Sequence, residues 1–221
     1  MITVFGYIGS PSADLREAVT DAVLVVGGRR HLDALNVPEE RRVVLGRIGP
    51  AIEALQALPD DAKAVVIASG DPLFFGVVRR IRAAGLKVRV VPAVTSLQLA
   101  FAAVALPWDD ALLVSLHGND PEPAIDLLRS HPKVGLLTDG KHGLPQIVAA
   151  TAGLGRSYVL AERLGEDDER VRVLTEEQAR EITETAQPNV VLVLAHHPDD
   201  PAALGEQTAI VGGFLAVGAQ P

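Results

Sequence analysis

The chain has 221 residues, of which 48% are hydrophobic and 22% are charged, and its formal net charge is −8. This composition provides enough apolar side chains for one large domain or two small ones and argues against intrinsic disorder. The negative charge argues against a nucleic-acid partner, since such proteins are normally basic.

Two further features narrow the class of protein. Cysteine is absent, which excludes disulfides, thiolate metal sites and thiol catalysis and fits a cytoplasmic location. No apolar stretch approaches the roughly 18–20 residues that a membrane-spanning helix needs, so no membrane association is expected. The N-terminal MITVFGYIG lacks a basic segment and a cleavage site, and it is expected to be the first strand and not a signal peptide.

The first half of the chain alternates short apolar runs with segments of helical periodicity. The runs are rich in Val and Ile and are bounded by Gly, Pro or Asp, which is typical of parallel strands buried on both faces. Strands are predicted over residues 2–6, 22–26, 43–45, 64–68 and 86–91, with helices over 48–58 and 73–84. This pattern predicts an open α/β sheet.

A second α/β series follows the segment Leu-Pro-Trp-Asp-Asp at 106–110. Its strands are predicted over residues 111–116, 134–138, 157–161 and 190–195, and its helices over 122–130, 144–151 and 176–183. We therefore expect an N-terminal domain over 1–108, a C-terminal domain over 109–195 and an extension over 196–221, although one continuous sheet would give the same pattern. The extension is compatible with an edge strand, a dimer contact or a loosely ordered tail.

Ligands of open α/β sheets bind outside the carboxyl ends of the strands, so the turns at those ends are the candidate sites. The glycine turn at 6–11 follows the first strand but matches neither a P-loop nor the dinucleotide fingerprint. Gly70-Asp71-Pro72 follows the fourth strand, and Phe74 and Phe75 come next. Either this turn contacts a ligand and the aromatic rings wall its pocket, or Asp71 caps a helix and the rings belong to the core.

Other turns carry polar groups at equivalent positions. Thr95 and Ser96 follow the fifth strand and either cap the next helix or face the crevice. Arg29, Arg30 and His31 follow the second strand and suit an anionic substrate. His117 stands in a similar turn after the sixth strand. No metal site is expected, because the adjacent His196 and His197 have no third ligand nearby.

Several of these segments occur in the same order in a known family. SGDPLFFG at 69–76, the run PAVTSLQLAFAAVALPWDDALLVSLHG from residue 92, GGRRHL at 27–32, LTDG at 137–140 and AERLGEDDERV at 161–171 resemble the tetrapyrrole (corrin/porphyrin) methylases of cobalamin synthesis. The closer similarity is to the precorrin-6Y C5,15-methyltransferase family, in particular its stand-alone C5-methylating members, and it covers about residues 2–195.

The resemblance implies two α/β domains with S-adenosylmethionine in the cleft between them, and S-adenosylhomocysteine as product. By similarity the cofactor-binding residues are Gly9, Ser69, Gly70, Asp71, Phe74, Thr95, Ser96, Asp139 and Leu164. Arg29, Arg30 and His31 would bind the carboxylates of the precorrin, and His31 or His117 would take up the proton lost from the ring. Departures from the family pattern affect Gly9, whose loop lacks the usual glycine spacing, Thr95, where Ser is frequent, and Asn119, where a basic residue is common.

The implied reaction is methyl transfer to C5 of a precorrin (precorrin-6Y or cobalt-precorrin-7). A homodimer and a separate C15-methylating, decarboxylating protein are the expected partners. Two alternatives stay open: a nucleotide- or phosphate-binding α/β enzyme that uses the loop at 6–10, and a non-catalytic protein that retains the fold. The sequence does not indicate whether the substrate contains cobalt.

Overall fold

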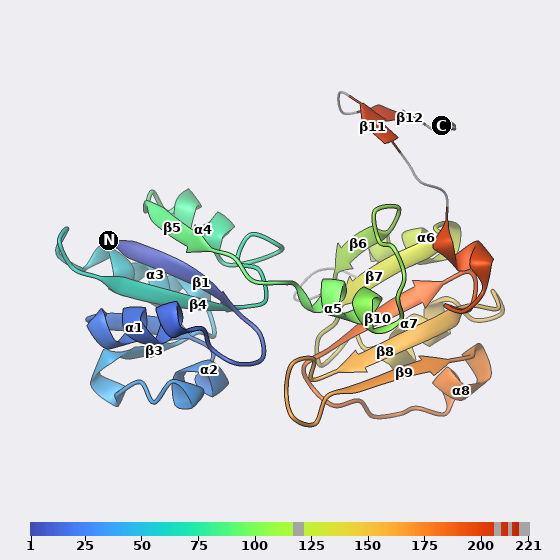
Figure 1. Ribbon diagram of the computed structural model, residues 1–221, viewed down its shortest axis with the longest axis horizontal. Coiled ribbons are helices and arrows are strands. Elements are labelled where there is room, and N and C mark those ends of the chain that lie inside the picture. Colours follow the sequence, from blue (N-terminus) through green and yellow to red (C-terminus); the bar gives the residue numbers. More distant parts are fainter. Residues whose placement is uncertain (117–121, 206–208, 212–213, 217–221) are drawn as a thin grey trace. The chain divides into compact units, whose positions relative to one another are not determined.

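The computed structural model describes residues 1–116, 122–205, 209–211 and 214–216. It divides into two compact units, residues 1–95 and 96–221, each built on its own five-stranded sheet. Figure 1 shows the elements of both units. No helix in these described ranges is long and apolar enough to cross a membrane.

Unit 1 is a doubly wound parallel sheet. Its strands are β1 (Ile2–Tyr7), β2 (Leu24–Gly27), β3 (Arg42–Val44), β4 (Ala64–Ser69) and β5 (Val88–Val91), in the order β3-β2-β4-β1-β5. Every adjacent pair is parallel. The helices are α1 (Ala13–Asp21), α2 (Arg29–Ala34), α3 (Ile48–Gln56) and α4 (Val78–Ala83), and a short 3₁₀ turn covers Glu39–Arg41.

The two faces of this sheet carry separate hydrophobic clusters. Phe5 and Ile67 pack with Leu15 of α1 and Leu32 of α2 on one face. Neighbouring strand residues pack against α3 and α4 on the other face. Burial on both faces explains why β1 and β4 are almost uninterrupted apolar runs.

Unit 2 contains a mixed sheet. Its strands are β6 (Leu112–Ser115), β7 (Lys133–Leu137), β8 (Ser157–Glu162), β9 (Arg170–Leu174) and β10 (Asn189–Leu194), in the order β6-β7-β10-β8-β9. Only β6 and β7 pair in parallel, and the other pairs are antiparallel. A separate antiparallel pair joins β11 (Ala209–Val211) and β12 (Phe214–Ala216).

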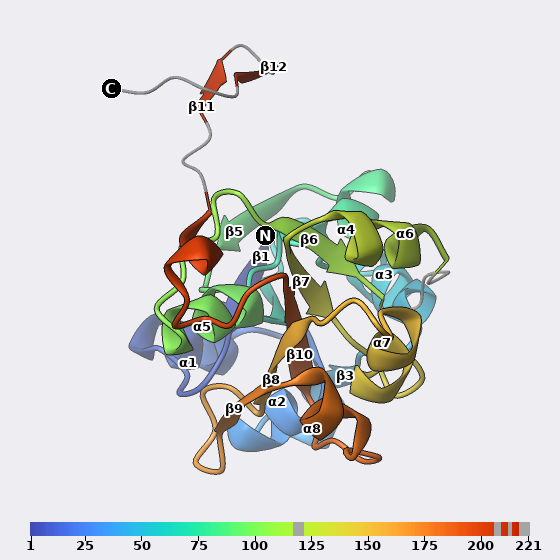
Figure 2. The ribbon, with the colours of Figure 1, turned by 90° about the vertical axis from the view of Figure 1, so that its right-hand side faces the viewer.

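Helices cover both faces of this second sheet. They are α5 (Ser96–Ala103), α6 (Glu122–Ser130), α7 (Leu144–Ala150) and α8 (Glu176–Arg180), and a 3₁₀ turn covers Pro201–Leu204. Figure 2 shows α5 on one side of the sheet and α6, α7 and α8 on the other. Gly135 of β7 admits α5 closely, since a Cβ there would lie 3.2 Å from Leu97 Cδ2 and 3.3 Å from Phe101 Cε2.

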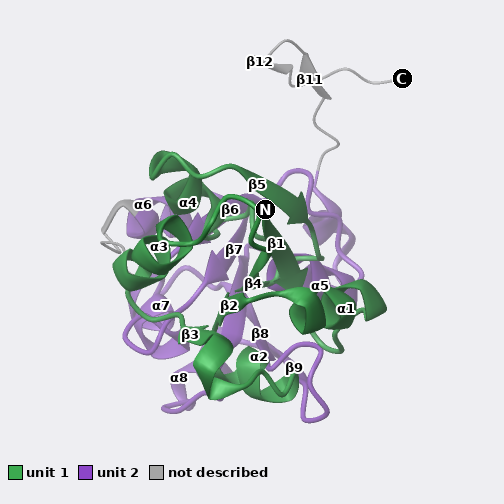
Figure 3. Cartoon of the chain, turned by 90° about the vertical axis from the view of Figure 1, so that its left-hand side faces the viewer, with its two compact units in different colours: residues 1–95 green, residues 96–221 purple. Residues whose placement is uncertain are grey.

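The division between the units falls after Thr95, whereas the sequence predicted a boundary at 108/109 (Figure 3). The reason is that α5 packs on β7 and β10. Lys133 also holds the predicted boundary segment within unit 2. Its Nζ donates to Asp110 Oδ1 at 2.6 Å, to Pro107 O at 3.0 Å and to Leu204 O at 3.2 Å. The same lysine therefore also contacts the predicted extension, at Leu204.

Several other elements differ from the sequence prediction, which did not include the helices α1 and α2. The strand β9 was not predicted, because its alternating Arg-Val-Arg-Val pattern belongs to a sheet edge and not to a buried run. The helix predicted over 73–84 begins only at Val78. The left-handed backbone of Phe75, with φ of 50°, interrupts any helix that would start earlier.

Candidate cofactor and substrate site

The topology of unit 1 places a switch point between β1 and β4. The connection after β1 runs through α1 on one face, and the connection after β4 runs through α4 on the other face. β1 and β4 are hydrogen-bonded neighbours, so their following loops diverge and leave a crevice at their carboxyl ends. This edge is the position at which open α/β sheets bind ligands.

Three backbone segments meet closely at this edge. Gly70 N donates to Tyr7 O at 2.9 Å, which joins the loops after β4 and β1. A Cβ on Gly6 would lie 2.6 Å from both Ala93 N and Gly70 O, so the loop after β5 belongs to the same junction. Only glycine fits at position 6, and apart from the glycine itself nothing in the sequence indicated this packing.

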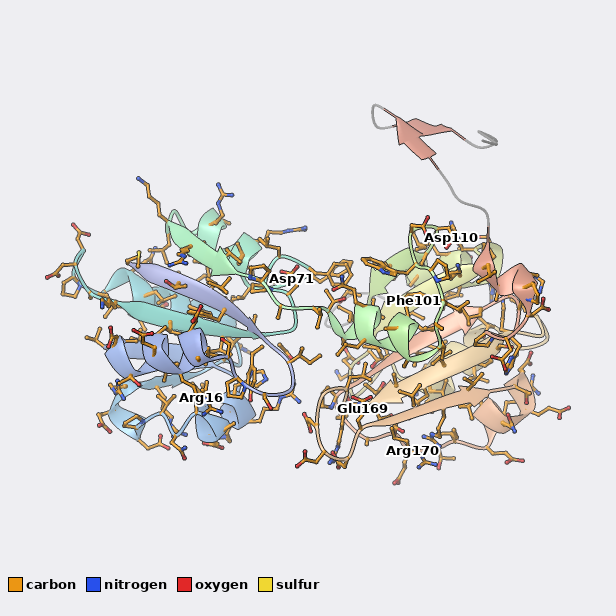
Figure 4. All side chains as sticks on the ribbon, viewed as in Figure 1. Arg16, Asp71, Phe101, Asp110, Glu169 and Arg170 are labelled. Atoms are coloured by element: carbon orange, nitrogen blue, oxygen red, sulfur yellow. The ribbon has the colours of Figure 1, made fainter. Side chains whose placement is uncertain are left out.

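The Gly-Asp-Pro turn is closed by its own carboxylate. Asp71 Oδ1 accepts a hydrogen bond from Leu73 N at 2.8 Å, and Phe74 N donates to Asp71 O at 3.1 Å. Gly70 is buried with φ of 69°. Because α4 begins at Val78, Asp71 does not cap a helix, and that alternative is wrong. Figure 4 labels Asp71 in this turn.

The two phenylalanines that follow the turn lie outside the hydrophobic core. Phe74 is half-buried and Phe75 is 52% exposed. Their ring centroids are 4.7 Å apart at an interplanar angle of 76°, an edge-to-face arrangement. The core-aromatic alternative is therefore also wrong, and at least one ring faces solvent beside the candidate site.

The cationic turn after β2 reaches the same edge. Arg30 Nη2 donates to Ser69 Oγ at 2.9 Å, so the turn is tied to the end of β4. Arg29 is exposed on the same turn. The ring of His31 stands edge-on to the ring of Tyr7, with centroids 4.7 Å apart.

His31 is buried to 8% exposure at the start of α2. Burial, together with the smaller effect of the nearby positive charge of Arg30, lowers its pKa from 6.5 to about 4. His31 is therefore neutral near pH 7. Its Nδ1 is buried and has no hydrogen-bond partner among the described residues.

Three other predicted cofactor-binding residues lie in or next to the loops that follow the strands of unit 1. Gly9 has φ of 68°, which suits glycine in the loop after β1. Thr95 is buried at the end of unit 1, and Ser96 is the first residue of α5 in unit 2.

In unit 2, the strands β7 and β8 end at the same edge of the sheet. β10 starts there, with Val190 beside Leu137 and Asn189 beside Glu162. Asp139 follows β7, and its Oδ1 accepts hydrogen bonds from Lys141 N and His142 N, both at 2.8 Å. Leu164 follows β8 and is 7% exposed. The structure thus brings Asp139 and Leu164 to one edge, while His117 and Asn119 lie outside the described residues.

A charged cavity of about 440 Å³ at the end of β8 was not predicted from the sequence. Its lining comprises Glu162, Arg163, Asp168, Arg170, Arg172, Glu184, Thr185 and Ala186. The buried Glu162 accepts from Ala186 N at 2.7 Å and from Arg172 Nη2 at 3.0 Å, and Arg163 pairs with Asp168. These contacts join β8, β9 and the segment before β10, so the charged side chains of the cavity stabilise this part of the sheet. The segment AERLGEDDERV at 161–171 contains four of these lining residues, but its sequence did not indicate a cavity.

No group of three or more His, Cys, Asp or Glu side chains arranged for a metal ion occurs in the part of the chain that the structure describes. The site therefore consists of glycine turns, one carboxylate turn, exposed arginines and exposed aromatic surface. Such a set binds and orients small molecules at a sheet edge. The fold and the site therefore define an α/β protein with a small-molecule site at the carboxyl edge of a sheet.

Comparison with known proteins gives the family. The model of the tetrapyrrole (corrin/porphyrin) methylases matches residues 12–180. A relative from Salmonella typhimurium named cobalt-precorrin-7 C(5)-methyltransferase is 31% identical over 185 residues, which cover 79% of this chain and 90% of the relative. The chain belongs to the tetrapyrrole methylase family and is a methyltransferase.

Solved structures show the same fold. A precorrin-6Y methylase of cobalamin biosynthesis from Archaeoglobus fulgidus matches with a TM-score of 0.64 and 24% identity, over 88% of this chain and 97% of that one. A uroporphyrin-III C-methyltransferase from Thermus thermophilus, solved with S-adenosylhomocysteine, matches with a TM-score of 0.63 and 20% identity, over 87% and 91%. Both likenesses confirm the predicted fold class.

Proposed function

We propose that the protein is an S-adenosylmethionine-dependent methyltransferase that methylates C5 of a precorrin in cobalamin biosynthesis, with precorrin-6Y or cobalt-precorrin-7 as substrate. The observation that carries this proposal is the 31% identity to the Salmonella typhimurium cobalt-precorrin-7 C(5)-methyltransferase over most of both chains. The glycine and carboxylate turns at the switch point of unit 1 support it, because they supply a ligand site where the fold requires one.

The turns at 6–9 and 69–71 fit S-adenosylmethionine. Gly70 has no side chain to cover its own peptide group, and its left-handed φ of 69° suits glycine at this turn. Asp71 uses Oδ1 within its turn, and Oδ2 accepts no hydrogen bond from the described residues. That oxygen is suited to accept from a ribose hydroxyl or from the ammonium group of the methionine portion.

The methyl donor supplies an electrophilic methyl group on a sulfonium centre, and the chain's residues bind and orient the reactants around it. Ser69, Gly70, Asp71, Phe74 and Thr95 are the proposed cofactor contacts in unit 1. Ser96, Asp139 and Leu164 are the proposed contacts in unit 2, and Gly9 shapes the first loop. Holding two reactants in line contributes on the order of 7–11 kcal/mol to a bimolecular reaction, which removes the need for a covalent intermediate.

Arg29 and Arg30 are the proposed partners of the precorrin carboxylates. Both are exposed at the carboxyl edge, and the hydrogen bond to Ser69 holds Arg30 beside the proposed cofactor turn. His31 is a poor base because its pKa is held at about 4. We therefore assign it a positioning role, in which its ring packs edge-on against the ring of Tyr7 and holds that side chain at the end of β1. That His117 accepts the proton lost from the ring stays a prediction.

The expected homodimer and the separate C15-methylating protein stay predictions. Sedimentation velocity of the pure protein tests whether it is a homodimer. Co-elution in size-exclusion chromatography with a C15-methylating, decarboxylating methyltransferase of the same pathway tests whether the two proteins bind each other.

Calorimetric titration with S-adenosylhomocysteine tests the proposed cofactor, with ATP as the comparison ligand. We expect saturable binding of the first and none of the second. Asp71→Ala should weaken S-adenosylhomocysteine binding about tenfold, the equivalent of one charge-assisted hydrogen bond. The matched control is Asp60→Ala, which removes an exposed carboxylate from a turn outside the site.

Transfer of a ¹³C-labelled methyl group to the precorrin, read by NMR at the C5 position, tests the reaction itself. Absence of S-adenosylhomocysteine binding to the wild-type protein would refute the proposal. Binding of ATP in its place would favour the nucleotide-binding alternative, and binding without turnover would favour the non-catalytic one.

A further inference from the structure

Phe75 combines an unusual backbone with an unusual exposure. Its φ is 50°, in the left-handed region that side chains other than glycine rarely adopt. Its ring is 52% exposed, directly after the proposed cofactor turn. Both features cost free energy, and such outliers persist when the surrounding structure enforces them or when they serve a function.

The other non-glycine residues in this region give a useful contrast. Arg163, with φ of 50°, lies in the turn after β8, where Glu166 N donates to Arg163 O, whereas Asn36 and Ala105 have φ of 51° and follow the ends of α2 and α5. There Val37 N donates to Leu32 O and Leu106 N donates to Phe101 O, contacts that end a helix through a left-handed residue. Phe75 ends no helix, since it precedes α4. Helix termination therefore does not account for its conformation.

The loop holds Phe75 in place from both sides. Upstream, Asp71 closes its turn through Leu73 N. Downstream, a Cβ on Gly76 would overlap the carbonyl oxygen of Pro72, so the backbone folds back tightly on itself. Phe74 supports the ring of Phe75 edge-on. The exposed ring is thus presented by an ordered turn.

Other apolar side chains are exposed on loops at this edge of unit 1. Leu73 is 61% exposed on the same loop, and Val94 is 47% exposed on the loop after β5. The latter follows Ala93, whose backbone N would lie 2.6 Å from a Cβ on Gly6. Exposed apolar groups grouped at a ligand edge indicate a binding surface. Arg29 and Arg30 add positive charge at the carboxyl edge of the same sheet.

We propose that Phe75 is a substrate-binding residue that lays its ring against the face of the tetrapyrrole, with Leu73 and Val94 extending the apolar surface. This inference rests on the proposed function. A tetrapyrrole substrate has a broad apolar face and a rim of carboxylates, which matches an exposed aromatic ring with arginines nearby. Phe75 then selects for the macrocycle, while the turn at 69–71 serves the cofactor.

Titration with uroporphyrin, a planar tetrapyrrole that carries carboxylates, tests this role through quenching of porphyrin fluorescence. Phe75→Ala removes the ring and keeps the strained backbone, whereas Phe75→Gly removes the ring and relieves the backbone. We expect both variants to bind uroporphyrin roughly tenfold more weakly than the wild type, the loss typical of one stacked aromatic contact. Calorimetry should show unchanged affinity for S-adenosylhomocysteine in both.

Ala105→Gly is the matched control, because it relieves a left-handed backbone in unit 2, away from this loop. It should leave both affinities unchanged. Citrate is the ligand control for carboxylate binding alone, and its affinity should not depend on Phe75.

Several outcomes would overturn the inference. These are uroporphyrin affinity unchanged in Phe75→Ala, a loss confined to Phe75→Gly, or an equal loss of S-adenosylhomocysteine affinity. A change in sedimentation of Phe75→Ala would assign the ring to contact with a second copy of the chain instead. Failure of the wild type to bind S-adenosylhomocysteine would refute the proposed function separately, since that ligand has no macrocycle.

Discussion

Replacing Gly6 by alanine tests the loop junction on which the candidate cofactor site depends. The added Cβ would lie 2.6 Å from Ala93 N and from Gly70 O, and 2.8 Å from Ala93 Cβ. Real Cβ atoms almost never approach other heavy atoms so closely, and two of these neighbours are backbone atoms that cannot rotate away. The loops after β4 and β5 must therefore move.

Overpacking of a well-packed site costs about 1–3 kcal/mol, and the upper end applies where backbone must shift. For a chain of this size, about 3 kcal/mol lowers the melting temperature by roughly 6–12 °C. Movement of Gly70 also displaces the proposed cofactor turn. We expect S-adenosylhomocysteine affinity to fall at least about tenfold, since small misplacements at a preorganised site are costly.

Thermal unfolding and calorimetric titration measure the two effects on the same sample. Gly46→Ala is the matched control, because a Cβ there meets nothing within 4 Å, and it should change stability by no more than about 0.5 kcal/mol. If Gly6→Ala kept both the melting temperature and the affinity of the wild type, the junction would not constrain the site and the reasoning would fail.

Two further predictions concern buried ionisable groups. Lys133→Met leaves the largely buried Asp110 without its partner and should lower the free energy of unfolding in urea by about 3–5 kcal/mol. The double variant Lys133→Met/Asp110→Leu should recover most of this loss. A free energy of unfolding of Lys133→Met within about 0.5 kcal/mol of the wild-type value would contradict the prediction. His31 has a folded-state pKa of about 4 against 6.5 when unfolded, so the unfolded chain takes up the proton first as pH falls and stability is lost between pH 6.5 and 4. As the pH falls from 6.5 to 4, the free energy of unfolding of His31→Phe should therefore decrease by up to about 3 kcal/mol less than that of the wild type. If the free energies of unfolding of the two proteins changed in parallel with pH, His31 would not be the source of this pH dependence.

The strands of unit 1 were predictable because parallel strands buried on both faces require continuous apolar runs. The predicted runs at 2–6 and 64–68 correspond to β1 and β4, each ending within a residue or so of the prediction. The turn Gly70-Asp71-Pro72 was likewise placed at a strand end, since Gly and Pro punctuate regular structure. The family followed from the order of several such motifs.

Contacts between distant residues were not predictable. Thr95 marks the division of the units only because Leu97 and Phe101 pack on β7, a strand more than thirty residues further along the chain. The late start of α4 follows from the tight turn around Phe75 and Gly76. The sequence pattern of this segment is compatible with a longer helix, so local preference alone misplaces its beginning.

By itself, the sequence determined most of the strands (although not the edge strand β9), the Gly and Pro turns that follow strand ends, and the family that the chain resembles, because each of these depends on residues close together in the chain. The tertiary structure decided the strand orders β3-β2-β4-β1-β5 and β6-β7-β10-β8-β9, the neutral state of the buried His31 and the exposure of Phe75. These properties depend on strand pairing and burial between residues far apart in sequence, and such long-range contacts leave no periodic pattern to read.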